Sequence, residues 1–130
     1  MAFEGFPVVI GLELTLACNL RCQHCASVAG IPRPNELGLD EILDICDQFP
    51  ALLVQEVDFT GGEPLLHKHW SQIAAHLNEL KIPVRMVSNG LLLEDNISRL
   101  VDARIATVGI SVDGLEATHD RIRERPEAVC

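Results

Sequence analysis

Apolar and polar residues follow two recurring patterns along this chain. Short runs rich in β-branched and aliphatic residues predict strands, and segments with apolar residues at i, i+3, i+4 and i+7 predict amphipathic helices. Strands are expected at Val8–Leu16, Val54–Thr60, Val84–Ser88 and Thr107–Val112. Helices are expected at Leu39–Phe49, at about 69–81, at about 95–103 and from about Ala117 onward.

The same pattern predicts the surroundings of these elements. The first strand is expected to be buried, because its apolar residues are nearly continuous. The third helix is expected to start at a cap formed by Asp95 or Asn96. Its core-facing residues are then expected to be Ile97, Leu100 and Val101.

Each predicted strand is followed by a predicted helix, which indicates a sheet of parallel strands joined by right-handed crossovers. Two architectures have this order: part of a (β/α) barrel, and a small doubly wound sheet. A closed eight-stranded barrel typically needs about 250 residues, whereas this chain has 130. The expected fold class is α/β, with about four parallel βα units of an incomplete, TIM-like barrel and two open sheet edges.

Composition and charge exclude several kinds of partner. Apolar residues make up 48% of the chain, enough for a core, and the net charge is -9. Such acidity argues against nucleic acid or an anionic membrane as the main partner. No apolar run approaches the ~20 residues of a membrane helix, and the first residues do not resemble a secretion signal. We therefore expect a cytoplasmic protein without nucleic-acid or membrane partners.

The cysteines provide the first candidate chemistry. Of the five, three are crowded together at Cys18, Cys22 and Cys25. An odd, crowded set is a poor disulfide framework and indicates a metal or cluster site in a reducing compartment. A structural zinc site takes four ligands, so zinc would need a distant fourth ligand such as His24, His67 or His69. A 4Fe-4S cluster held by three cysteines instead leaves one iron open to a substrate or cofactor.

Further unusual residues follow the other three predicted strands. The second strand is followed by Gly61-Gly-Glu-Pro64, the third by Ser88-Asn-Gly90, and the fourth runs into Ser111-Val-Asp-Gly114. Because ligands in α/β folds bind at the carboxyl ends of parallel strands, these segments and the cysteines are expected to line one rim.

The cysteine spacing and the Gly-Gly-Glu-Pro turn, each after the appropriate strand, resemble the radical S-adenosylmethionine (radical SAM) enzymes. The resemblance covers about residues 8–125. It implies a partial barrel of which residues 1–130 form the N-terminal part of the core domain, as a truncated chain or a fragment. The stretch Thr118–Arg123 is most similar to members that modify peptides or proteins and carry a SPASM-type extension.

The resemblance also implies roles for the residues of the cysteine loop. Cys18, Cys22 and Cys25 would hold three irons of a 4Fe-4S cluster, and the amino and carboxylate groups of SAM would chelate the fourth. His24 stands where the family usually has an aromatic residue that contacts adenine.

The remaining roles fall on the other strand ends. Gly61 and Gly62 would let the backbone approach the SAM amino group, and Glu63 would order that turn or accept from the same group. Ser111 would bond the ribose or the carboxylate, and Arg123 would pair with the SAM carboxylate. Further candidates for cofactor contacts, with a plain strand-ending turn as the alternative, are Ser88, Asn89 and Asp113.

The reaction implied by the resemblance is reductive cleavage of SAM to a 5′-deoxyadenosyl radical, which removes a hydrogen atom from a substrate. It implies an electron donor such as flavodoxin or ferredoxin, and a peptide or protein substrate. Two alternatives remain from the residues alone: a catalytically incompetent fragment, and a zinc-binding or partner-binding module.

Overall fold

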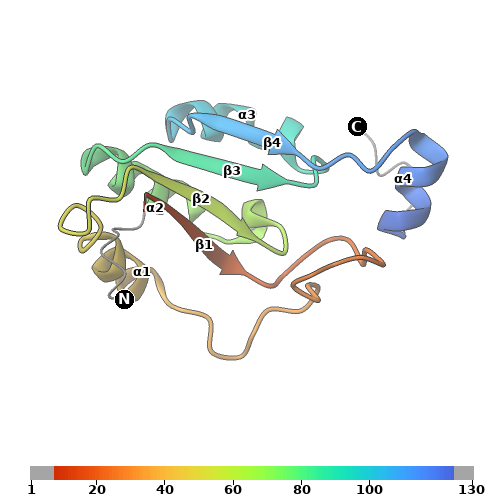
Figure 1. The fold of residues 1–130 in the computed structure, drawn as a ribbon, viewed down its shortest axis with the longest axis horizontal. Helices are drawn as coiled ribbons and strands as arrows, with labels where there is room; N and C mark the ends of the chain where they lie inside the picture. The colour runs from red at the N-terminus through yellow and green to blue at the C-terminus, as the bar shows by residue number, and fades with distance from the viewer. Residues whose placement is uncertain (1–7, 125–130) are drawn as a thin grey trace, which may run out of the picture.

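The fold of residues 8–124 is described by a computed structural model. Its strands are all parallel and lie in the order β1-β2-β3-β4, so that neighbours in the sequence are neighbours in the sheet. Figure 1 shows the four arrows pointing the same way, with α4 beyond their tips. The elements are β1 (Val9–Thr15), α1 (Leu39–Cys46), β2 (Glu56–Gly61), the short 3-10 helix η1 (Pro64–Leu66), α2 (Trp70–Glu79), β3 (Val84–Ser88), α3 (Leu93–Asp102), β4 (Thr107–Ile110) and α4 (Glu116–Arg123).

One face of the sheet forms the core together with α1, α2 and α3. Phe59 pairs in register with Leu12 on one side and Met86 on the other. Phe59 and Met86 are fully buried, and they belong to one cluster with Trp70 and Ile73 of α2. Because these helices cover the same face and the strand order is sequential, the fold matches a partial (β/α) barrel rather than a doubly wound sheet. The predicted fold class is confirmed.

The opposite face of the sheet is polar and open. Side chains alternate across a strand, so Asp58 and Arg85, which are register partners, lie opposite the core. Arg85 pairs with Glu56 at 2.9 Å and with Asp58 at 3.5 Å. This face therefore has no second hydrophobic layer within residues 8–124, as expected of a barrel segment without its opposite wall.

Several predicted boundaries and environments are wrong. The first strand is an edge strand with one open face, so Val9 is 48% exposed rather than buried. Strand β2 begins at Glu56, because the amide of Val54 instead bonds the carbonyl of Phe49 in the preceding turn. Strand β4 ends at Ile110, two positions before the predicted end. Helix α1 ends at Cys46, although Phe49 beyond it is still buried.

Helix α3 departs most from its prediction. It begins at Leu93 without a side-chain cap, so Asp95 and Asn96 lie inside the helix rather than before it. Asn96 is buried, and its amide donates to the carbonyl of Leu92 at 2.9 Å. The inward face is therefore the one that carries Asn96 and Leu100, while Ile97 and Val101 are 57% and 70% exposed. No helix within residues 8–124 is long and apolar enough to cross a membrane.

Candidate functional site

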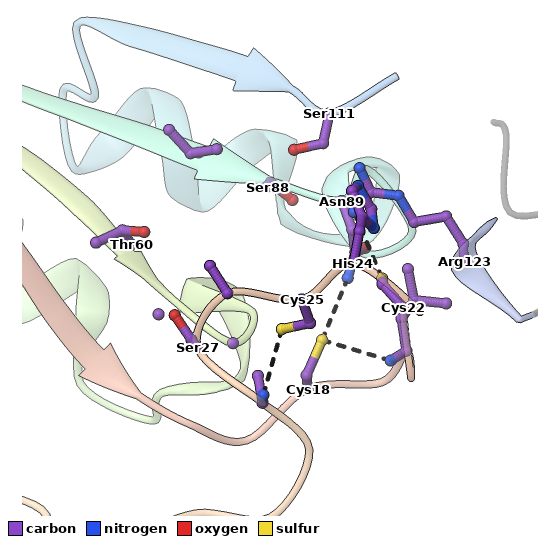
Figure 2. Close-up of a pocket in the computed structure, with 16 residues that line it drawn as sticks. Cys18, Cys22, His24, Cys25, Ser27, Thr60, Ser88, Asn89, Ser111 and Arg123 are labelled. Atoms are coloured by element: carbon purple, nitrogen blue, oxygen red, sulfur yellow. Dashed lines mark hydrogen bonds between the residues drawn. The ribbon is translucent and has the colours of Figure 1, made fainter. Parts of the chain in front are cut away.

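A pocket of about 260 Å³ lies where the four strands end. It is formed by the loop after β1, the turns after β2 and β3, the end of β4 and the last turn of α4 (Figure 2). It therefore lies on the rim predicted for the site. The predicted site residues that line it are Cys18, Cys22, His24, Cys25, Gly61, Gly62, Ser88, Asn89, Ser111 and Arg123.

The cysteine loop is folded by its own backbone. Two successive turns are closed by hydrogen bonds from the Cys25 amide to the Cys22 carbonyl and from the Val28 amide to the Cys25 carbonyl, each 3.2 Å long. The base of the loop is closed by Gly30, whose amide donates to Leu16 and whose carbonyl accepts from Cys18. The spacing of the cysteines thus brings all three thiols to one wall of the pocket.

Each thiol receives at least one N–H donor, and Figure 2 marks these contacts as dashed lines. Burial raises the pKa of the Cys18 thiol, and the nearby Cys22, Glu63 and Cys25 raise it further. A bound metal reverses this preference, because a coordinating thiol is deprotonated. The sulfur–donor pairs are Cys18 Sγ with Leu20 N (3.4 Å) and Asn89 Nδ2 (3.9 Å), Cys22 Sγ with Arg123 Nη1 (3.6 Å), and Cys25 Sγ with Ala29 N (3.3 Å).

The two glycines after β2 allow close contact between that turn and the chain entering the cysteine loop. The amide of Gly62 donates to the carbonyl of Thr15 at 2.7 Å. A Cβ on Gly62 would lie 2.2 Å from the carbonyl oxygen of Ala17, and one on Gly61 would lie 2.3 Å from that of Thr15. Gly61 also has a φ of +133°, which disfavours a side chain. Close packing within the chain therefore explains why both positions need glycine, independently of the predicted approach of a cofactor.

Glu63 connects the turn after β2 to the turn after β3. Its carboxylate is fully buried and accepts hydrogen bonds from the Leu65 amide (3.2 Å), the Ser88 hydroxyl (3.0 Å) and the Asn89 amide (2.9 Å). Burial raises the pKa of Glu63, although these hydrogen bonds oppose the change. The carboxylate lies behind the pocket wall, so the geometry supports the predicted ordering of the turn.

Asp113 and Arg123 attach α4 to the cysteine loop. Arg123 Nε donates to Asp113 Oδ2 at 2.5 Å and Nη2 donates to Oδ1 at 3.1 Å. His24 Nε2 lies 3.2 Å from the same Oδ1, and the amide of Gln23 donates to the Ile122 carbonyl at 2.9 Å. The hydrogen bonds from Arg123 lower the pKa of Asp113. Asp113 itself lies behind the pocket lining, with its carboxylate facing Arg123 and His24.

This arrangement agrees with the family comparison. The family model described as the Radical SAM superfamily matches residues 12–129, which is most of the chain. The chain belongs to the Radical SAM superfamily.

The relatives in this superfamily have names that describe different activities. The chain is 34% identical over 120 residues to the sporulation killing factor maturation protein SkfB of Bacillus subtilis, covering 92% of this chain and 29% of that protein. It is 34% identical over 132 residues to an AdoMet-dependent heme synthase of Methanosarcina barkeri, covering 98% of this chain and 38% of that protein. The chain thus spans about a third of the length of these relatives.

Solved structures show the same fold. Streptococcus suis SuiB bound to S-adenosylmethionine superposes with a TM-score of 0.80 at 21% identity, covering 93% of this chain and 29% of SuiB. SuiB bound to its precursor peptide SuiA gives a TM-score of 0.81. The four βα units of this chain therefore match the N-terminal part of a radical SAM partial barrel.

The superfamily implies a 4Fe-4S cluster and SAM, and the site fits the cluster. Three soft thiolate ligands share one pocket, and each sulfur has an N–H donor. Within residues 8–124 no three His, Cys, Asp or Glu side chains converge closely enough to hold a single ion. Of the three histidines considered as a fourth zinc ligand, His24 lines the pocket, whereas His67 and His69 do not. Cys46, the last residue of α1, is buried in the core outside the pocket lining, and Cys130 lies outside the described residues.

Glu36, in the loop between β1 and α1, is a structurally important residue that the sequence analysis missed. Its carboxylate accepts hydrogen bonds from the Leu16 amide (2.7 Å), the Arg33 amide (3.0 Å) and the Thr15 hydroxyl (2.9 Å). These bonds outweigh partial desolvation and lower the pKa of Glu36. Glu36 thereby attaches the far side of the loop to the end of β1. Its position in a Pro- and Gly-rich segment carried no spacing signal for this role.

Proposed function

We propose that this chain is the N-terminal, cofactor-binding part of a radical SAM core domain, and that the enzyme built on it cleaves SAM reductively to modify a peptide or protein. The observation that supports this most strongly is the placement of Cys18, Cys22 and Cys25 on one pocket wall beside the Gly61–Gly62 turn. The remaining βα units of the barrel are proposed to come from outside residues 1–130.

In this proposal Cys18, Cys22 and Cys25 hold three irons of the cluster. The bound cluster and SAM would supply the chemistry, which is one-electron reductive cleavage of SAM coupled to removal of a hydrogen atom from the substrate. The chain's own residues would bind these groups and orient them. The hydroxyl of Ser111 lines the pocket and offers a polar contact to the cofactor, whereas the side-chain amide of Asn89 donates to Cys18 Sγ and Asn19 Oδ1 and so holds the cysteine loop.

Apolar residues complete the pocket lining, and two buried or half-buried carboxylates outside the lining hold its loops in place. Leu20, Ala29 and Val87 contribute apolar surface to the pocket lining, and Val87 is 44% exposed, so exclusion of solvent is proposed to depend on the remaining units of the barrel. Glu63 and Glu36 hold the turns that carry the lining residues, because each accepts hydrogen bonds from two loop amides.

A peptide or protein substrate is supported by SkfB, a maturation protein, and by the SuiB structure with a precursor peptide. The acidic chain and its free thiols support a reducing, cytoplasmic location. The electron is proposed to come from a flavodoxin- or ferredoxin-type donor.

The test is anaerobic reconstitution of the chain with iron and sulfide, followed by EPR of the reduced protein with and without SAM. We expect a 4Fe-4S signal whose shape changes when SAM is added. Cys18→Ala is expected to lose the signal, whereas Cys46→Ala removes a buried thiol outside the pocket and is expected to keep it. A protein that binds zinc but no iron, or a signal that SAM leaves unchanged, would overturn the proposal.

A further inference from the structure

Arg123 brings its guanidinium from α4 to the cysteine loop. The side chain is 12% exposed, and its Nη1 lies 3.6 Å from Cys22 Sγ. The opposite edge of the same guanidinium, Nε and Nη2, is occupied by the two oxygens of Asp113. The side-on edge of the guanidinium is therefore already paired with a carboxylate within the chain, and Nη1, at the other end, donates to the Cys22 sulfur.

The position of Arg123 is fixed from a second direction by the backbone. Ile122, its neighbour, accepts a hydrogen bond from the amide of Gln23, which adjoins Cys22. The last turn of α4 and the middle of the cysteine loop are thus joined by a backbone bond and by the Asp113–Arg123 pair. Both contacts hold Nη1 beside the Cys22 sulfur, at the pocket lining to which Arg123 belongs.

We propose that Arg123 is a positioning residue for the cluster ligand Cys22: held by Asp113, it donates Nη1 to the ligating sulfur and offsets its negative charge, instead of pairing with the carboxylate of SAM. This inference rests on the proposed function and deepens it. Hydrogen bonds to cluster sulfurs and nearby positive charge stabilise the reduced, more negative cluster. Arg123 is therefore expected to raise the reduction potential of the cluster before SAM binds.

The test compares Arg123→Gln with Arg121→Gln, which removes the same charge from an exposed position on the same helix. The potential of the SAM-free cluster is measured by an EPR-monitored redox titration, and SAM affinity is measured separately on the reconstituted protein. We expect the Arg123→Gln potential to fall below that of the wild type and the Arg121→Gln potential to stay unchanged. SAM affinity is expected to change by less than about tenfold, a difference of about 1.4 kcal/mol.

The opposite pattern would overturn the inference: an unchanged potential with SAM affinity reduced by more than about tenfold. It would assign Arg123 to the SAM carboxylate while leaving the proposed function intact. If the wild-type protein retains no iron and sulfide after reconstitution, both the proposed function and this inference are overturned. If Arg123→Gln fails to hold a cluster, Arg123→Lys decides, because a single ammonium cannot replace the guanidinium that bonds Asp113 and Cys22 together. Its potential is expected to lie below that of the wild type, and an identical potential would refute the inference.

Discussion

The carboxylate of Glu63 accepts a 2.9 Å hydrogen bond from the backbone amide of Asn89, and this bond joins the turn after β2 to the turn after β3. A fully buried carboxyl group is unusual unless its oxygens are satisfied. Here both oxygens are occupied by donors from two different loops. The base of the pocket therefore depends on an acceptor that itself lies outside the pocket lining.

Replacing Glu63 by Gln is expected to destabilise the fold. The new NH2 group has to face either the Leu65 amide or the Asn89 amide, so one buried donor loses its acceptor in either orientation. Such a loss costs about 1–3 kcal/mol. Urea unfolding measures the change, with Glu79→Gln at an exposed position of α2 as the control. Equal unfolding free energies for the two variants would contradict the prediction.

Glu36 is expected to make stability depend on pH in the acid range. Its pKa is lowered in the folded protein, so the ionised form stabilises the fold fully above the ordinary glutamate pKa of about 4.3. That contribution is lost as the pH falls through the lowered pKa. The difference in unfolding free energy between wild type and Glu36→Gln should therefore shrink as the pH falls below about 4.3. A difference that stays constant between neutral and acid pH would refute this prediction.

Substituting Gly62 tests whether the turn after β2 needs close packing. Gly62→Ala would place a Cβ 2.2 Å from the Ala17 carbonyl oxygen, and overpacking of this kind typically costs about 1–3 kcal/mol. Gly11→Ala is the matched control, because nothing lies within 4 Å of its Cβ position. Thermal unfolding should show a lower midpoint for Gly62→Ala and no loss for Gly11→Ala. A shared decrease would mean that the contact with Ala17 is not responsible.

Asp113→Asn is expected to loosen α4 from the cysteine loop. Arg123 lowers the pKa of Asp113, so Asp113 is ionised at neutral pH and both of its bonds to Arg123 are charge-assisted. Asparagine keeps one acceptor oxygen, so the variant loses one of these bonds and the charge behind the other, at an expected cost of about 1.5–3 kcal/mol, and hydrogen exchange of the Gln23 and α4 amides is expected to become about tenfold faster or more. Asp102→Asn, at an exposed position of α3, controls for the lost charge. Unchanged exchange at Gln23 would argue that the backbone bond alone holds α4.

The sequence predicted those features that local chemistry determines. Strand β3 has its predicted bounds, because Pro83 precedes an alternating apolar run and Asn89-Gly90 ends it. The cysteines and the Gly61–Gly62 turn lie on one rim because parallel strands place their carboxyl ends together. The first result follows from residues close together in the chain, and the second follows from the order of parallel strands that the hydrophobic pattern predicts.

Features that depend on distant partners could not be predicted in this way. Glu36 bonds Thr15 and Leu16, about 20 positions away, and no spacing rule indicates such a contact. The inward face predicted for α3 was wrong at Ile97 and Val101, because the packing of the helix on the sheet turns the side of Asn96 and Leu100 inward. The role of Asp113 likewise depends on α4 folding back onto the cysteine loop.

The contact between Arg123 and Cys22 spans 101 positions of the chain, and this separation has a consequence during synthesis. Ribosomes add about 5–20 residues per second, so Arg123 is made about 5–20 s after Cys22. During that interval the cysteine loop has its turns and its Glu36 anchor but no helix fastened across it. A cluster inserted while the chain is still being made would meet a loop free to adjust, whereas insertion into the finished protein would meet a loop that Arg123 and Ile122 of α4 already hold.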